Sequence, residues 1–236
     1  MPPGPQSWSV DMDTVVRGPY LNLDPKRNSY KFNHLRKQIR SGMFIKLGDI
    51  LQAVKAVRPG IKPSGTHDYV EIEKVGFGDY DCVSSRGWEL PQRARLRAKA
   101  GDLFIAHLWS SAGKWFVAAG DTTNLLVTNG FAHFRFLEGM EDYLPDIAVG
   151  LSSEAFRVQL RALSTGSDGL AEISDLDMAE IILPVIDDPA LREKIKDGLV
   201  HVLAGRSSFA KDVRQAISNW KNFPTPPPRK SHCALV

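Results

Sequence analysis

Residues 101–107, Gly-Asp-Leu-Phe-Ile-Ala-His, form the stretch of sequence that decides the fold. Four apolar residues follow the Gly-Asp pair, and the Ser- and Gly-containing segment 110–113 separates them from a second apolar run at 115–118. Short apolar runs bounded by turn residues are typical of buried strands. We therefore expect two paired strands, 102–106 and 115–118, around an exposed turn.

Other short apolar segments lie between Gly- and Pro-containing turns and are expected to form further strands. Residues 131–136 give the clearest pattern, because Ala132, Phe134 and Phe136 alternate with His133 and Arg135. A period of two is typical of a half-buried strand. The remaining strands are expected at 44–47, 69–72, 81–83 and 125–127.

Helical spacing indicates helices at both ends of this strand-rich region. Residues 28–40 are basic, with Leu35 and Ile39 one turn apart and Gly42 close behind, which predicts a helix with a solvated cationic face. After Gly139 we expect helices at 142–151 and at 153–163, the second capped by Ser152. A loop is expected at 164–169, a turn at 174–176, and a strand at 179–183 that ends at Pro184. Amphipathic helices are expected at 189–202 and 207–220, with a break at Gly205 between them.

These elements predict an α+β fold with a twisted, mostly antiparallel sheet or partial barrel and short helices, followed by C-terminal helices. We expect four parts along the chain. They are a loose arm at 1–20, one domain at 21–186, a helical segment for partner docking or dimerisation at 187–222, and a disordered, proline-rich tail at 223–236.

The composition is that of an ordinary globular protein. The 236 residues are 43% hydrophobic and 24% charged, and the net charge of +3 permits nucleic acid as a partner without requiring it. Cys82 and Cys233 fit neither a disulfide framework nor a metal spacing, which favours the reducing cytoplasm. The sequence shows no signal peptide and no apolar run of the roughly 20 residues that cross a bilayer, so no membrane association is expected.

Motifs that carry catalysis are missing from the sequence. There is no Asn/Asp-Pro-Pro-aromatic motif of a DNA methyltransferase, no Walker loop, no Gly-x-Ser-x-Gly elbow and no pair of histidines with ligand spacing. Asp24-Pro25-Lys26 matches only a fragment of a nuclease motif, and Cys233-Ala234-Leu235-Val236 matches a prenylation box only superficially. We expect a protein without a catalytic residue, metal or cofactor of its own, although a nuclease that uses unrecognised carboxylates remains an alternative.

The order of several short motifs resembles the target-recognition domain of type I restriction–modification specificity subunits. Each motif is weak alone, but together they follow the family order over residues 44–186. They are Phe-Ile-Lys-Leu-Gly-Asp-Ile at 44–50, Tyr-Val-Glu-Ile at 69–72, Gly-Asp-Leu-Phe-Ile at 101–105, Asn-Gly-Phe at 129–131, Ser-Ser-Glu-Ala-Phe at 152–156, Ser-Thr-Gly at 164–166, Ile-Ser-Asp-Leu at 173–176 and Ile-Ile-Leu-Pro at 181–184.

The resemblance implies a non-catalytic DNA reader that leaves the chemistry to other subunits. Its implied partners are double-stranded DNA, a DNA adenine methyltransferase subunit, and a restriction or translocase subunit or a second copy of this chain, within phage defence. Family members carry two recognition domains separated by long helices, whereas this chain has room for one. The alternative from another class is a protein-interaction adaptor of a phage-defence complex that retains the recognition-domain fold.

DNA recognition needs cations for phosphates and polar side chains for base edges. Arg93, Arg95 and Arg97 alternate with apolar residues, so an extended segment would present all three on one side, as a phosphate contact or as a plain charged edge strand. The turn at 110–115 could enter a groove, or be a solvated turn with its tryptophan in the core. The full candidate set is Arg58, Lys62, Lys74, Arg86, Arg93, Arg95, Arg97, Ser111, Lys114 and Trp115.

Overall fold

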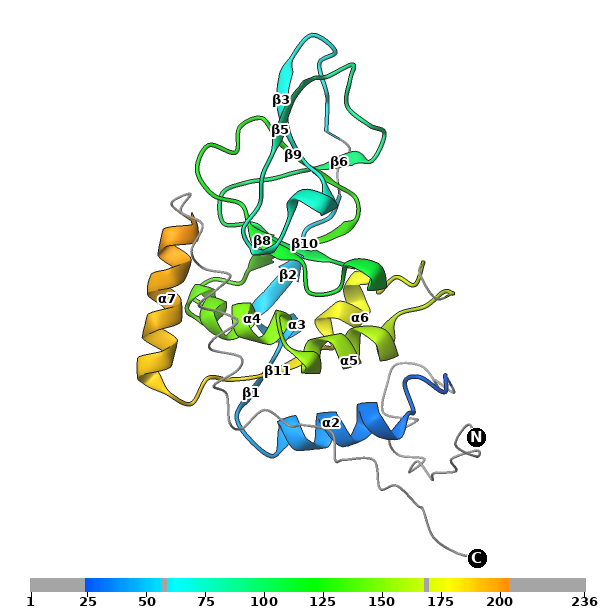
Figure 1. Cartoon of the computed structure of the whole chain (residues 1–236), viewed down its shortest axis with the longest axis vertical. Helices are drawn as coiled ribbons and strands as arrows, with labels where there is room; N and C mark the ends of the chain where they lie inside the picture. Colours follow the sequence, from blue (N-terminus) through cyan, green and yellow to red (C-terminus); the bar gives the residue numbers. More distant parts are fainter. Residues whose placement is uncertain (1–23, 57–58, 168–169, 204–236) are drawn as a thin grey trace, which may run out of the picture.

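Three sheets and a set of helices build the fold, which a computed structural model describes for residues 24–56, 59–167 and 170–203 (Figure 1). The central sheet has the order β2-β10-β7-β8-β4, with strands Leu51–Ala53, Phe131–Phe136, Leu103–Ala106, Trp115–Val117 and Phe77–Gly78. The outer sheet has the order β5-β3-β9-β6, with strands Val83–Arg86, Thr66–Val70, Leu125–Thr128 and Ala94–Arg97. The small sheet pairs β1, Phe44–Lys46, with β11, Ile182–Pro184.

The helices gather at one end of the molecule, and the outer sheet projects at the opposite end (Figure 1). The α-helices are α2, Tyr30–Arg40; α3, Leu47–Ile50; α4, Leu144–Leu151; α5, Glu154–Leu163; α6, Asp175–Ala179; and α7, Pro189–Leu203. Three short 3-10 turns are η1, Ile72–Lys74; η2, Trp109–Ser111; and η3, Glu141–Tyr143. None of the described helices is long and apolar enough to cross a membrane.

The central sheet is buried on both faces, which explains its continuous apolar strand. In β7, Leu103 and Ile105 belong to the core shared with the helices, whereas Phe104 and Ala106 belong to the core shared with the outer sheet. The register of β7 with β8 is antiparallel and places Ile105 opposite Trp115, confirming the expected strand pair. The central sheet therefore connects the helical end to the outer sheet.

Strand β10 differs from its expected half-buried pattern, because its first four residues are all buried. Ala132 and Phe134 pack toward the helices, and Phe131 packs toward the outer sheet. His133 is buried as well, with its ring stacked on Phe104 at a centroid distance of 4.4 Å. His133 occupies a position that a half-buried strand would expose to solvent, but in β10 this position is covered as well.

A fully buried carboxylate, Asp102, fixes the start of β7. Gly101, with φ +85°, turns the chain into the strand, and the Lys99 amide donates to Asp102 Oδ2 at 2.9 Å. His133 Nε2 lies 2.7 Å from the same oxygen, while Arg135 donates to Oδ1 from Nε at 2.9 Å and from Nη2 at 2.6 Å. These partners satisfy a charge that would otherwise be costly to bury.

Gln159 joins α5 to β11 by acting as an additional strand partner. Its side chain is fully buried, and its Nε2 donates to the Ile182 carbonyl at 2.7 Å and to the Ala155 carbonyl at 3.2 Å. Its Oε1 accepts from the Ile182 amide at 3.1 Å. The polar residue on the apolar face of this helix therefore satisfies both backbone groups of a buried edge residue.

Helix α7 packs against α4 through apolar and charged contacts. Ile195 and Leu199 are buried, and Arg192 Nη2 lies 2.9 Å from the fully buried carboxylate of Asp146, which also accepts from the Ile186 amide at 2.8 Å. Burial raises the pKa of Asp146, and the hydrogen bond from Ile186 and the charge of Arg192 oppose this shift. The helix expected at 189–202 is thus held to the domain by a paired buried charge.

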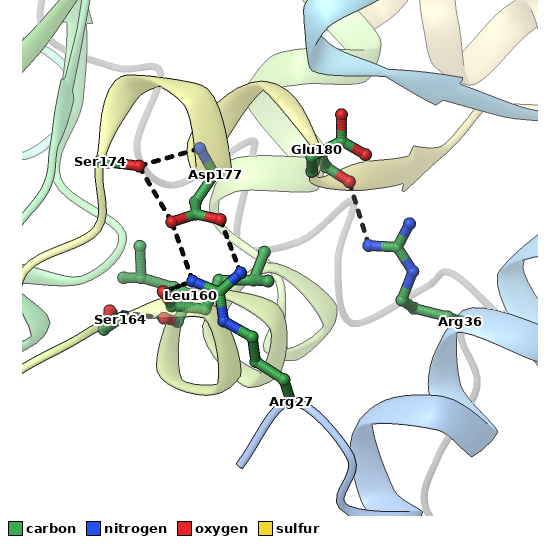
Figure 2. A network of polar contacts seen from close by, with 8 residues as sticks. Arg27, Arg36, Leu160, Ser164, Ser174, Asp177 and Glu180 are labelled. Carbon is green, nitrogen blue, oxygen red and sulfur yellow. Dashed lines mark hydrogen bonds and ion pairs between the residues drawn. The ribbon is translucent and has the colours of Figure 1, made fainter. Parts of the chain in front are cut away.

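The segment that begins at residue 24 is attached to the helical end by two arginines (Figure 2). Arg27 forms a bidentate pair with Asp177 of α6, at 2.7 and 2.9 Å, and donates to the Leu163 carbonyl at 3.1 Å. Arg36 of α2 donates to the Glu180 carbonyl at 3.0 Å, and burial together with the neighbouring Arg40 lowers the pKa of Arg36 to about 10. These contacts explain why the expected basic helix packs on the domain.

The structure shifts several expected boundaries for local reasons. Ser153, not Ser152, caps α5, because its side chain accepts from the Phe156 amide. Helix α6 continues to Ala179, so the expected strand begins at Ile182 and includes Pro184 at the edge of a two-stranded sheet. Strands β3 and β5 begin at Thr66 and Val83 instead of at the positions expected from the sequence.

The α+β class with mostly antiparallel strands is confirmed, and the sheets do not close into a barrel. Two pairs are parallel, β3 with β9 and β4 with β8. The expected arm at 1–20, the helix at 207–220 and the tail at 223–236 lie outside the described residues.

Replacing Gln159 by leucine is expected to lower the free energy of unfolding by about 2 kcal/mol or more, because both Ile182 backbone groups lose their partner in a buried setting. Urea denaturation measures the change. Gln52→Leu, at an exposed position of β2, is the matched control and should stay within about 0.5 kcal/mol of wild type. Equal stabilities of the two variants would contradict this role of Gln159.

The stability is expected to fall as the pH is lowered from about pH 7 to pH 5, because His133 is buried and His107 is partly buried. Burial lowers the pKa of His133, against the opposing effect of Asp102, and burial also lowers the pKa of His107. Below about pH 6.5 the unfolded chain then binds more protons than the folded one, which favours unfolding. In urea titrations, His133→Gln should show a shallower fall than wild type, and an unchanged slope would contradict the assignment.

Candidate nucleic-acid interface

The edge strand β6 carries Arg95 and Arg97, and Arg93 directly precedes it, so three arginines lie along this edge of the outer sheet. Ala94 and Leu96 are buried against the sheet, whereas Arg95 is exposed and Arg97 half-exposed, so the alternation expected from the sequence is present. The pairing of β6 with β9 shifts register between Ala94 and Leu96. Strand β6 therefore presents a row of cations along a sheet edge, which we call the arginine edge (Arg93, Arg95 and Arg97).

The three guanidinium groups differ in how far they are neutralised. Arg93 Nη2 lies 3.3 Å from Glu71 Oε1, in an exposed pair that weakens its charge only modestly. Arg95 donates from Nε to the Gln92 carbonyl at 3.0 Å, and Arg97 donates from Nη1 to the Thr123 carbonyl at 3.0 Å. Backbone carbonyls orient these two side chains without cancelling their charge, so Arg95 and Arg97 are the better placed for phosphate.

A second pair of candidates lies at the free end of the β3–β5 pair. Lys62 and Arg86 are both exposed, and Arg86 Nη1 donates to the Ser64 carbonyl at 3.3 Å. The Gly87 amide donates to the Gly65 carbonyl at 2.9 Å, which connects the two segments. The structure thus brings Lys62 and Arg86 together, although 23 residues separate them in the sequence.

The remaining candidates lie near the turns η1 and η2. Lys74 is exposed and Ser111 is half-buried, but Lys114 donates from Nζ to the Ile72 carbonyl at 2.8 Å. Trp115 is fully buried in the core between the central sheet and the helices, and its Nε1 donates to Ser152 Oγ at 3.4 Å. A side chain that is enclosed on all sides has no access to DNA, so the structure removes Trp115 from the candidate set. Arg58 lies outside the described residues.

Two arginines of α5 lie beside η2 and were not among the residues expected from the sequence. Arg161 stacks over the Trp109 ring at 5.4 Å, and a Cβ at Gly113 would lie 3.6 Å from Arg157 Nη2. Both arginines are exposed, and neither forms an ion pair with a described residue. Their spacing of four residues indicates one shared helix face, but only the fold places that face beside the η2 turn.

Two further observations concern residues 24–56, 59–167 and 170–203, which the structure describes. Within these ranges, no group of three or more His, Cys, Asp and Glu side chains is arranged to hold a metal ion. Exposed cations lie at the arginine edge, at the free end of β3–β5 and beside η2, and further exposed cations lie on α2 and α7. The first two groups share the projecting outer sheet, where an extended polyanion could contact both.

Comparisons with known proteins agree on the fold. No protein-family model and no curated protein matches the sequence. A chain from a structure of complex assembly and conformational transition in the type I restriction–modification system has a TM-score of 0.52 and 18% identity, over 73% of this chain and 44% of that chain.

Two further structures are similar at lower scores. The HsdS subunit from Thermoanaerobacter tengcongensis gives a TM-score of 0.49 and 17% identity over 73% of this chain and 43% of its own. The type I restriction–modification S subunit from M. genitalium gives a TM-score of 0.41 and 14% identity over 66% of this chain and 37% of its own. This chain therefore spans less than half of each of these chains. The sequence resemblance is confirmed at the level of the fold, which is that of a type I specificity-subunit target-recognition domain.

Proposed function

We propose that this chain is a non-catalytic, sequence-specific DNA-binding module that positions a DNA methyltransferase in a restriction–modification system. The observation that carries the proposal is the arginine edge on a fold of the specificity-subunit type. A rigid row of cations on one side of a sheet can follow a phosphate backbone, and such contacts set the register of a protein on a duplex.

Base readout is assigned to the loops that surround this edge. Loops at the free end of the outer sheet carry Lys62 and Arg86, and the η2 turn carries Ser111 beside Arg157 and Arg161. Arg and Lys pair with guanine edges in the major groove, and a serine hydroxyl can contact several bases. Phosphate contacts by the arginine edge and base contacts by the loops would divide the two tasks of recognition between different elements.

Catalysis is assigned to partner subunits. The helical end, with α7 held on α4, offers a surface remote from the outer sheet for a methyltransferase, and also for a restriction subunit or a second copy of the chain (Figure 1). A second copy of this chain would bring a second recognition module to the same duplex.

Loss of the arginine edge is expected to flatten the salt dependence of DNA binding. Each phosphate contact contributes about 0.9 to the slope of log Kd against log salt concentration, so Arg93, Arg95 and Arg97 together contribute up to about 2.7. The triple alanine variant should show this loss, and Arg95→Ala/Arg97→Ala should show most of it because Arg93 is paired with Glu71. Fluorescence anisotropy with a pool of short duplexes at several salt concentrations measures the slope.

The control for this experiment is Lys194→Ala, which removes an exposed cation from α7 at the helical end. Its slope should equal that of wild type. An unchanged slope in the triple variant would refute the phosphate contacts, and absence of any salt-dependent duplex binding by wild type would refute the DNA-binding function as a whole.

Purification of the tagged full chain from its native host is expected to bring down a DNA methyltransferase subunit. Mass spectrometry of the bound proteins identifies the partner, and selection of bound DNA from a random library identifies the recognised site. If the purified complex contains no methyltransferase and no DNA sequence is selected, this proposal is wrong. The chain would then be a protein-interaction adaptor.

A further inference from the structure

Two short loops at the free end of the outer sheet are tied together by backbone hydrogen bonds. The Gly87 amide donates to the Gly65 carbonyl at 2.9 Å, and the Trp88 amide donates to the Pro63 carbonyl at 3.1 Å. A Cβ at Gly87 would lie 2.2 Å from the Lys62 carbonyl oxygen, so only glycine permits this approach. The two loops, 62–66 and 86–89, therefore form one fixed unit, which we call the double loop.

The double loop holds a tryptophan in solvent. Trp88 is 71% exposed, the largest exposure of any aromatic side chain that the structure describes. Two residues further along, Leu90 packs beside Tyr69, Ala94 and Leu126 in a small core of the outer sheet, so this chain segment does bury an apolar side chain. Because a large apolar ring is normally stabilised by burial, a fixed loop that exposes one indicates a ligand that covers it.

The charges around Trp88 indicate the nature of that ligand. Lys62 and Arg86 are exposed on the same double loop, and neither forms an ion pair with a described carboxylate. The one acidic residue of the double loop, Glu89, accepts a hydrogen bond from the Arg86 amide at 2.9 Å. An exposed aromatic ring on the same fixed loops as two exposed cations can bind a base together with its flanking phosphates.

We infer that Trp88 contacts a base of the bound duplex by stacking, as a wedge at one base step, with Lys62 and Arg86 on the adjacent phosphates. This inference rests on the proposed DNA-binding function and names the residue that supplies its apolar contact. Base–aromatic stacking is independent of counterion release, unlike contact of an arginine with phosphate. The double loop needs no rearrangement to present the ring, because its backbone is already fixed.

The test compares Trp88→Ala and Trp88→Phe with wild type in duplex binding across a salt series. Loss of stacking should weaken binding by about fivefold or more at every salt concentration, with an unchanged slope of log Kd against log salt. Trp88→Phe, which keeps an aromatic face, should recover a large part of the affinity. Leu176→Ala removes an even more exposed apolar side chain, from α6, and should bind like wild type.

A second measurement locates the contact directly. Duplexes that carry 5-bromodeoxyuridine are irradiated in complex with the full chain, and the crosslinked peptide is mapped by mass spectrometry. A crosslink at Trp88 supports the inference. Because Trp88 is exposed, circular dichroism should show that both variants fold like wild type.

These measurements distinguish the stacking role of Trp88 from the DNA-binding function of the chain. If wild type binds duplexes with a salt slope that depends on the arginine edge, while Trp88→Ala binds equally well and no crosslink forms at Trp88, the stacking role is wrong and the DNA-binding function stands. If Trp88→Ala instead lowers recovery of a protein partner without affecting duplex binding, the double loop is a protein contact. If wild type binds no duplex, both proposals fail together.

Discussion

Burial of both faces of the central sheet is the constraint on which the rest of the structure depends. In β7, alternate residues enter two different cores, Leu103 and Ile105 toward the helices and Phe104 and Ala106 toward the outer sheet. The strand can therefore carry no polar side chain without a buried partner. Every other element is positioned relative to this sheet, with a helical end on one side and a projecting outer sheet on the other (Figure 1).

Asp102 and Gln159 enter this interior with hydrogen-bond partners for their side chains. Asp102 is satisfied by Lys99, His133 and Arg135, and Gln159 satisfies both backbone groups of Ile182. Such contacts are directional, so they fix the position of one element against another where apolar packing alone would tolerate sliding. The same rigidity extends to the outer sheet, whose exposed cations are oriented by backbone carbonyls.

The surfaces to which we assign a function lie outside this core. The arginine edge and the double loop lie on the projecting outer sheet, and α7 lies at the helical end. Separate surfaces would allow one chain to contact a duplex and a catalytic partner at the same time.

The sequence alone was sufficient for features that depend on neighbouring residues. Strand β7 follows from four consecutive apolar residues, the turn expected at 174–176 coincides with the start of α6, and the alternation of Arg95 and Arg97 with Leu96 predicts an edge with one charged side. The order of short motifs indicated the fold through its resemblance to a known family, since an ordered series of local motifs is more specific than any one of them.

Only the tertiary structure decided which side chains face solvent and which distant residues meet. Trp115 lies beside an exposed turn in the sequence but is enclosed by the helices, and Lys114 is held by the Ile72 carbonyl. Arg157 and Arg161 approach η2, and β3 pairs in parallel with β9, through contacts between residues far apart in the chain. Sequence periodicity predicts which residues share one face of a strand or helix. Which faces are covered depends on how segments far apart in the sequence pack together, so only the tertiary structure shows it.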